Sequence, residues 1–216
     1  MNVVDLRSMR RILLATVVGC ALSGGVAAQT AAQPAGPAAA APRSLKPAAG
    51  TYKIDLPHTH AYFVISHLGI SRFMGRFDDI AGEYVVGERA EQSSVKASIR
   101  VDSINAKHQK LEEHLRSPDF FDAARFPSMD FVSTKVGWNQ RGEGKLIGNL
   151  SLHGVTRPVE FALKVTGAGP GKRGEMRSGF EAKTTIKRSD YGMAYGLPSV
   201  VGDQVEITLS VEGVMQ

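Results

Sequence analysis

An imidazole can bind a metal ion, form hydrogen bonds, and gain or lose a proton near neutral pH, and three histidines lie within ten residues of this sequence. His58 and His60 are two residues apart, so on a β-strand they would share one face, a spacing that suits a metal ion. No third ligand is evident from the spacing around them. We therefore expect solvent-exposed histidines rather than a metal site.

His67 is the third of these histidines, and it has the same strand parity as Phe63 and Ile65. If those apolar side chains point into a core, the His67 imidazole points there as well. It would then hydrogen-bond the hydroxyl, carbonyl or carboxylate head of a ligand. Alternatively it would satisfy a carbonyl group at the end of the strand. The sequence leaves these two roles open.

Two clusters place an arginine close to an aromatic residue. Arg116 and Asp119 flank the predicted end of a helix, next to Phe120. The Arg116 guanidinium would meet an acidic or phosphate head group at an opening of the fold, or it would pair with Asp119 and hold the helix in place. We favour the ion pair. Arg188 and Tyr191 form a second cluster with the same two interpretations.

Several kinds of catalytic and cofactor motif are missing from the sequence. It contains no Gly-rich phosphate loop, no Gly-x-Ser-x-Gly and no His-Glu-x-x-His. A single cysteine excludes a disulfide framework and a Cys-based zinc site. We therefore expect a binding protein without a cofactor, a metal ion or catalytic residues. The alternative is a hydrolase or isomerase that acts on an isoprenoid-like ligand with His67 as acid or base.

Apolar and polar residues alternate with a period of two through most of the sequence after residue 57. For example, Val95, Ile99 and Val101 alternate with Lys96 and Arg100. One apolar and one polar face are typical of antiparallel strands with one side in water. Eight such strands close as a barrel or stack as a sandwich, and closure removes exposed edges. The predicted strands are 58–67, 72–86, 94–102, 128–137, 144–153, 157–167, 177–189 and 203–213.

A short helix near residues 105–117 interrupts this pattern. Leu111 and Leu115 are four residues apart among charged residues, and Pro118 ends the segment. Aromatic residues follow within a few positions. The helix and the aromatic loop after it are expected to plug one end of a barrel or to cover it.

The N-terminal end of the chain is typical of a secretory signal peptide, which we assign to residues 1–28. Arg7, Arg10 and Arg11 precede an uncharged apolar run, and small residues follow it. The run is too short for an integral membrane span, which needs about 20 apolar residues. Because the residues before Cys20 resemble the lipobox of bacterial lipoproteins, a lipid anchor at Cys20 is the alternative to cleavage after the small residues.

Residues 29–50 are rich in alanine and proline and are predicted to be a linker, which leaves residues 51–216 as a single domain. The whole chain has 216 residues, a net charge of +5 and an isoelectric point near 9.4, a balance that suggests nucleic acid or a membrane surface as a partner. The domain alone has 21 Lys and Arg against 20 Asp and Glu. The excess charge therefore lies mostly in the leader and linker, and nucleic acid is excluded as the partner.

Five stretches of the domain together resemble the YceI-like family of lipid-binding proteins, also called polyisoprenoid-binding proteins. They are HTHAYFVISH (58–67), HLRSPDFFD (114–122), LSLHGVTRP (150–158), RSDYG (188–192) and VEGV (211–214). Pro118 and Tyr191 are local departures. The resemblance implies an all-β, lipocalin-like eight-stranded antiparallel barrel with an apolar tunnel for an isoprenoid chain. It also implies a periplasmic location, in agreement with the signal peptide, and it allows a homodimer.

The apolar faces of a closed barrel point inward, because the polar faces contact water. On pattern alone these side chains would fill the interior, as in most cores; the resemblance favours a tunnel. The expected ligand is a polyisoprenoid, a quinone-like molecule or a fatty-acid-like chain, bound mainly through apolar area. The predicted ligand-binding residues are Phe63, Ile65, His67, Ile99, Arg116, Phe120, Leu150, Phe161, Leu163, Phe180, Ile186, Tyr191, Ile207 and Leu209.

Overall fold

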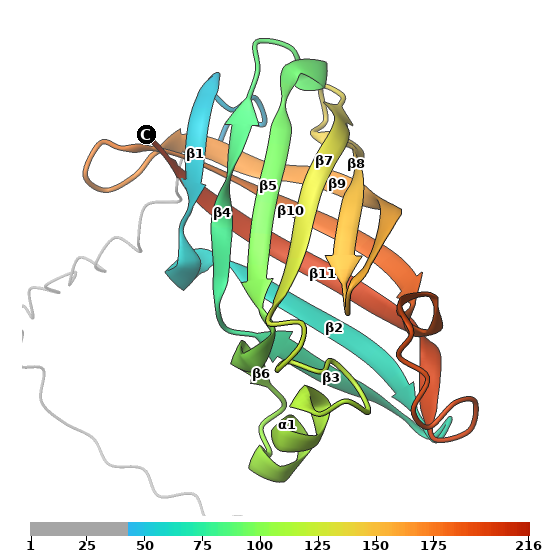
Figure 1. The fold of residues 1–216 in the computed structure, drawn as a ribbon. Helices are drawn as coiled ribbons and strands as arrows, with labels where there is room; N and C mark the ends of the chain where they lie inside the picture. The colour runs from blue at the N-terminus through green and yellow to red at the C-terminus, as the bar shows by residue number, and fades with distance from the viewer. Residues whose placement is uncertain (1–42) are drawn as a thin grey trace, which may run out of the picture. The chain divides into compact units, whose positions relative to one another are not determined.

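The computed structural model describes residues 43–216 (Figure 1). The predicted signal peptide, the predicted linker as far as residue 42, and Cys20 lie outside the described residues. The described part is built of antiparallel strands and contains one α-helix. Its strands are β1 (Gly50–Ile54), β2 (His60–His67), β3 (Ser71–Phe77), β4 (Ile80–Val86), β5 (Ser94–Arg100), β6 (Ile104–Asn105), β7 (Ser128–Trp138), β8 (Glu143–Leu152), β9 (Val155–Pro170), β10 (Met176–Lys187) and β11 (Val201–Met215).

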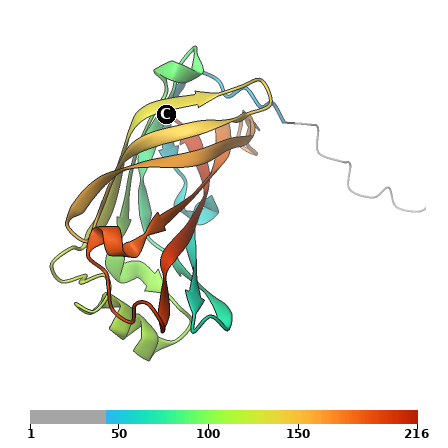
Figure 2. The same ribbon diagram turned by 90° about the vertical axis from the view of Figure 1, so that its right-hand side faces the viewer.

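Eight of these strands close into a barrel, in the order β1-β4-β5-β7-β8-β9-β10-β11, with β11 pairing back to β1. Figures 1 and 2 show the ring from two directions. The 15 residues of β11 make the closure, because one end of the strand pairs with β1 and the rest pairs with β2. Strands β2, β3 and β6 continue the wall beyond β11. The predicted eight-stranded antiparallel barrel is therefore confirmed.

The strands of the ring differ from the predicted ones at two places. The predicted strand 72–86 is two strands, β3 and β4, because the chain turns at Asp78 and Asp79, where Asp78 pairs with Arg76 at 2.7 Å. Strand β1 was not predicted, although it belongs to the ring. Its Tyr52 is fully buried and stacks on Tyr84 of β4 with the ring centroids 5.1 Å apart.

The alternation of apolar and polar residues orients the strands as the sequence predicts. In β9, Val159, Phe161 and Leu163 are buried, whereas Glu160 and Ala162 between them are exposed. Each buried aliphatic or aromatic side chain contributes about 1.5–3 kcal/mol relative to an exposed one. A shift of one residue in register would move all of them to the outside, so the pattern fixes the register.

The helix α1 (Gln109–Arg116) lies below the barrel, at the end where β6 is found (Figures 1 and 2). It begins later than predicted because His108 is the N-cap, with its Nδ1 accepting a hydrogen bond from the Leu111 amide at 3.4 Å. Leu115 is buried and Leu111 is half-buried, and both pack against the core. The helix thus plugs this end of the barrel, which is the first of the two roles expected from the sequence.

Arg188 links the wall to the loop that leads into β11. Its side chain is buried, and it donates hydrogen bonds to the carbonyls of Gly202, Met193, Tyr195 and Val201 at 2.7–2.9 Å. Burial lowers the pKa of its guanidinium, because the charged form loses water contacts. The four carbonyls replace that water, so this arginine organises the loop.

Replacement of Arg188 is expected to cost far more stability than replacement of an exposed arginine. Arg188→Met leaves four carbonyls without their donor, so we expect a loss of at least about 3 kcal/mol in the free energy of unfolding. Arg100 is a matched control, since it is mostly exposed and forms ion pairs with Asp79 and Asp102; Arg100→Met is expected to cost below about 1 kcal/mol. Urea unfolding measures both, and equal losses would contradict this role of Arg188.

Candidate functional site

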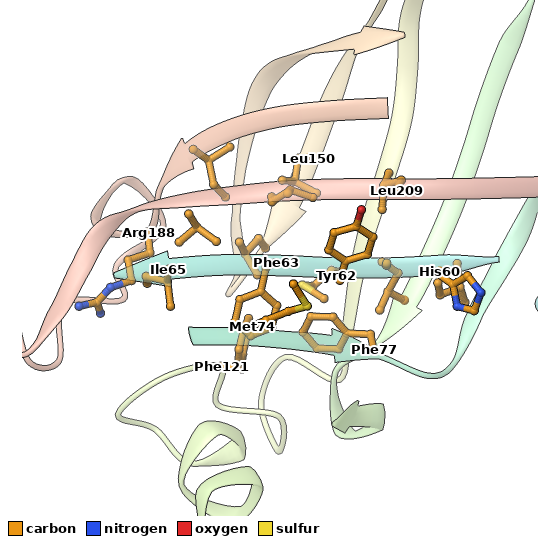
Figure 3. A pocket seen from close by; sticks show the side chains of 18 of the residues that line it. His60, Tyr62, Phe63, Ile65, Met74, Phe77, Phe121, Leu150, Arg188 and Leu209 are labelled. Atoms are coloured by element: carbon orange, nitrogen blue, oxygen red, sulfur yellow. The ribbon is translucent and has the colours of Figure 1, made fainter. Parts of the chain in front are cut away.

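A cavity of about 540 Å³ runs through the barrel interior, within the range of about 300–1,000 Å³ that is usual for ligand sites. Eleven of the predicted ligand-binding residues line it. Figure 3 shows part of the lining, with Phe63 and Ile65 on β2, and Leu150 and Leu209 on the strands behind. The eleven are Phe63, Ile65, His67, Ile99, Phe120, Leu150, Phe161, Phe180, Ile186, Ile207 and Leu209. That a ligand contacts these residues stays a prediction.

Three predicted residues do not line this cavity. Arg116 donates instead to the carbonyls of Asp102 at 2.9 Å and Ile104 at 3.1 Å, which fixes the helix to the chain before it. Tyr191 is buried in the core beside the cavity, and its burial raises the pKa of its hydroxyl. Leu163 lies further along the barrel, in the cluster around Val136.

The structural role favoured for Arg116 is therefore found with different partners. The expected ion pair with Asp119 is absent from the described residues, because Asp119 lies 2.9 Å from Nε2 of His114. Within the described part of the chain, the Arg116 guanidinium reaches a carboxylate only at Glu112, at 3.7 Å. The helix is therefore held through hydrogen bonds from Arg116 to backbone carbonyls, not through the predicted ion pair with Asp119.

Aromatic rings gather at the helix end of the cavity, where Leu111 and Leu115 of α1 also line it. The Phe121 ring contacts Phe77 edge-on, with centroids 5.5 Å apart, and Phe63 at 6.4 Å. Figure 3 shows the three rings on the side of the cavity that faces α1. Edge-to-face pairs of this kind add about 0.5–1.5 kcal/mol beyond the buried area. The sequence indicated this plug through the two phenylalanines that follow the helix.

The cavity reaches solvent along β2 and β3. The lining residues that are exposed all belong to these two strands, namely His60, His67, Ser71, Arg72 and Met74. Strand β3 pairs with β6 only through its last two residues, so its outer edge from residue 71 to 75 has no partner strand among the described residues. An opening along an unpaired strand edge gives a long ligand a route that leaves the ring intact.

His67 lies at the end of β2 and is exposed at this opening. Within residues 43–216, no side-chain hydrogen bond to its imidazole is present, so neither ring nitrogen is occupied by a carboxylate or a strand-end carbonyl. Its geometry therefore suits contact with a polar group of a ligand at the cavity opening.

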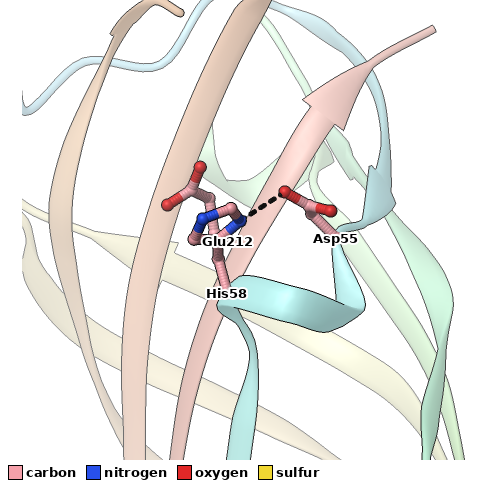
Figure 4. A group of neighbouring side chains, drawn as sticks. All are labelled: Asp55, His58 and Glu212. Atoms are coloured by element: carbon pink, nitrogen blue, oxygen red, sulfur yellow. Dashed lines mark hydrogen bonds and ion pairs between the residues drawn. The ribbon is translucent and has the colours of Figure 1, made fainter.

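His58 and His60 do not share a strand face, which corrects the spacing argument. Pro57 precedes His58 in a 3-10 turn (Leu56–His58), so β2 begins only at His60. The His58 Nδ1 lies 2.8 Å from Asp55, and Glu212 of β11 completes a group of three metal-type ligands (Figure 4).

An arginine already neutralises the two carboxylates of this group. Arg177 donates to Asp55 at 2.7 Å and to Glu212 at 2.5 Å. Its guanidinium holds the pKa of Asp55 below the ordinary value, with His58 as the second cause. A metal ion would have to displace the guanidinium, so the group is best described as an ion-pair network that joins β10, β11 and the end of β1.

The comparison with known proteins agrees with the fold. The family described as the YceI-like domain matches residues 52–213. The chain belongs to the YceI-like family. Among curated relatives, the YceI protein of Salmonella arizonae is 38% identical over 171 residues, which cover 78% of this chain and 88% of that protein. A UPF0312 protein of Pseudomonas aeruginosa is 39% identical with the same coverage.

Solved structures of YceI-like and related proteins have the same fold. A Campylobacter jejuni YceI protein is 27% identical, with a TM-score of 0.61 over 70% of this chain and 90% of that one. BcnA of Burkholderia cenocepacia has a TM-score of 0.67 at 21% identity and covers 74% of this chain and 98% of its own. A polyisoprenoid-binding domain from Saccharophagus degradans has a TM-score of 0.61 at 17% identity and covers 76% of this chain and 98% of its own.

Sequence reasoning missed several residues of the cavity wall. Met129, Met193 and Val201 line it, but they lie at strand ends or in loops where the period of two gives no signal. Phe73 and Phe77 were hidden because 72–86 was treated as one strand. Among the described helices, none has the length and apolar composition to cross a membrane.

The ion-pair network predicts a loss of stability in acid. Because the pKa of Asp55 is lower in the folded protein than in the unfolded chain, its contribution is complete above the unfolded pKa of about 4. The contribution is lost as the pH falls through the folded pKa. We expect Asp55→Asn to flatten the decline of unfolding free energy between about pH 5 and pH 2. Chemical unfolding at a series of pH values measures the slope.

Arg177→Met is the companion variant, since it removes the first cause of the lowered pKa of both Asp55 and Glu175. It is expected to flatten the acid slope more than Asp55→Asn does. An unchanged slope in Asp55→Asn would show that the pairing seen here does not contribute to stability.

Proposed function

We propose that this protein binds a polyisoprenoid or a similar long-chain amphiphile in the barrel cavity. The observation that carries the proposal is a cavity of about 540 Å³ whose inner lining is almost entirely aliphatic and aromatic. Empty apolar volume of this size is costly in a core, because lining atoms lose their packing contacts. An apolar chain would restore those contacts. Its burial would stabilise the complex by roughly 25 cal/mol for each Å² of apolar surface removed from water. The resemblance in fold to a polyisoprenoid-binding domain supports the same ligand class.

The head group of such a ligand belongs at the opening along β2 and β3. Polar lining residues gather there, including His67, Ser71 and Arg72. The Arg72 guanidinium pairs with Glu206 across the wall and is largely exposed. These side chains suit a hydroxyl, carbonyl or carboxylate group, whereas the interior recognises a chain by shape and area alone.

The predicted signal peptide supports a periplasmic location, with a lipid anchor at Cys20 as the alternative. A soluble carrier is needed where an apolar molecule has to cross an aqueous compartment. We infer carriage or storage of the lipid, or protection during stress, as the role there. A quinone-like or fatty-acid-like chain fits the same cavity chemistry, and a homodimer is compatible with it.

The proposal includes no covalent chemistry. The alternative, a hydrolase or isomerase with His67 as acid or base, requires a group that orients the imidazole. Within residues 43–216 no carboxylate bonds to it, which favours binding. Chromatography of an isoprenoid ester after long incubation with the protein decides between the two: intact ester supports binding, and turnover lost in His67→Gln supports catalysis.

Native mass spectrometry of the protein secreted by a bacterial host tests the binding proposal. We expect an apolar adduct on the parent protein. Leu150→Trp places an indole ring in the cavity where the parent protein has an aliphatic side chain. We therefore expect the amount of bound adduct to fall at least roughly tenfold, with a loss of about 1–3 kcal/mol in the free energy of unfolding. The matched control is Val132→Trp, because Val132 is an apolar residue exposed on the outside of β7.

The result that supports the proposal is loss of the adduct in Leu150→Trp and its retention in Val132→Trp. A parent protein without any adduct, or equal adducts in both variants, would contradict a ligand inside the barrel. The same spectra report the mature N-terminus and any acyl group on Cys20.

A further inference from the structure

Three exposed apolar side chains, Leu68, Ile70 and Val200, form what we call the apolar tip. Their exposed fractions are 50%, 84% and 42%. Leu68 and Ile70 belong to the turn between β2 and β3, and Val200 lies in the loop before β11. The Leu68 amide donates to the Val200 carbonyl at 2.8 Å, which joins the two loops. Figures 1 and 2 place both loops at the end of the barrel that holds α1.

Folding does not explain why these residues are apolar. Leu68 has a φ of 54°, a left-handed conformation that disfavours leucine by roughly 1 kcal/mol and favours glycine or asparagine. Its side chain is half exposed, so it recovers little of this cost by burial. Ile70, at 84% exposed, contributes almost nothing to the core. The positive φ thus disfavours leucine at position 68, and exposure to water disfavours isoleucine at position 70. Their apolar side chains point to contact with an apolar surface outside the chain.

The two segments that form the apolar tip contain no acidic residue. Residues 60–77 contain Arg72 and Arg76 and no acidic residue, and residues 191–202 contain no charged residue. Both arginines do form ion pairs, with Glu206 and Asp78. An uncharged tip with cations on the same hairpin complements a lipid surface with anionic head groups.

The tip is continuous with the opening of the cavity. Ser71 and Arg72 follow Ile70 directly and line the cavity, and so does Met74, whose side chain is 62% exposed. A path therefore leads from the tip along β3 to the interior, past the polar Ser71 and Arg72 to the apolar Met74. The buried arginine of this end, Arg188, holds the loop that carries Val200.

We propose that the apolar tip docks the protein on the surface of a lipid bilayer, so that a chain passes between the bilayer and the cavity along β3. The proposal rests on the proposed function, because the ligand is taken to be a membrane lipid.

A second copy of the chain is less suited than a bilayer to cover the apolar tip. A stable dimer buries about 800 Å² on each partner, with 20–30 residues a side, whereas the tip is two short loops. Membrane contact has no such minimum size, because its strength scales with the apolar area inserted among the head groups and with the attraction to anionic lipids.

Co-sedimentation with vesicles of phosphatidylethanolamine and phosphatidylglycerol tests the docking. The secreted protein carries Cys20→Ala, so that no acyl anchor contributes. In this background the test variant is Leu68→Asn with Ile70→Asn, in which asparagine suits the positive φ and keeps the turn. The control is Leu56→Asn with Val132→Asn, two apolar residues exposed away from the tip. We expect the test variant to lose at least roughly tenfold in partitioning, and the control to bind like the parent.

Thermal unfolding confirms that both double variants are folded, and native mass spectrometry records their ligand content. Selective loss of vesicle binding supports the docking, whether or not a lipid is found in the cavity, so its failure is distinct from that of the proposed function. Equal partitioning of test variant and control would overturn the docking. The docking would also be overturned, in favour of self-association, if the parent protein does not bind vesicles and forms an oligomer that the tip substitutions dissociate into monomers.

Discussion

Strand β11 forms backbone hydrogen bonds along both of its edges, to β10 on one side and to β1 and β2 in turn on the other. Because the ring closes through this strand, its backbone groups are paired inside the wall and the interior needs no polar partners of its own. That condition allows the interior to be lined almost entirely by aliphatic and aromatic side chains. Under the proposed function, the interior would recognise a ligand by area and shape, and polar selection would be confined to the opening.

The two ends of the barrel are closed by different means, so the two ends of the cavity are not equivalent. At one end, Tyr52 and Tyr84 stack, and the Tyr84 hydroxyl donates to the carbonyl of Ser178 at 2.8 Å, so buried side chains of the wall itself close that end. At the other end, the plug consists of the helix α1 and the loop after it, which carries Phe121. Loops tolerate movement at less cost than paired strands. The proposed ligand would therefore enter most easily beside β3, whose outer edge has no partner strand among residues 43–216.

The alternation in β2, β5 and β7 to β11 was sufficient to predict these strands, the apolar interior and ten of the eleven lining residues, all but Phe120, because a period of two is a local property. Contacts that depend on remote backbone could not be predicted. Arg188 and Arg116 looked like candidates for head groups or ion pairs, and both bind carbonyl groups of distant segments. Strand β1 escaped notice because five residues beside an alanine-rich stretch carry too little pattern. His58 was misplaced because Pro57 fixes a turn just before the strand.

Occupation of the barrel interior by an apolar chain underlies the proposed function. Methyl NMR of the protein titrated with farnesol measures this occupation most directly, because each methyl signal reports its own surroundings. We expect the signals of Leu150, Ile207 and Leu209, which line the cavity, to shift together and saturate. Signals of the exposed Leu56 and Val132 should stay in place. Shifts confined to surface methyls, with the interior signals unchanged, would contradict it.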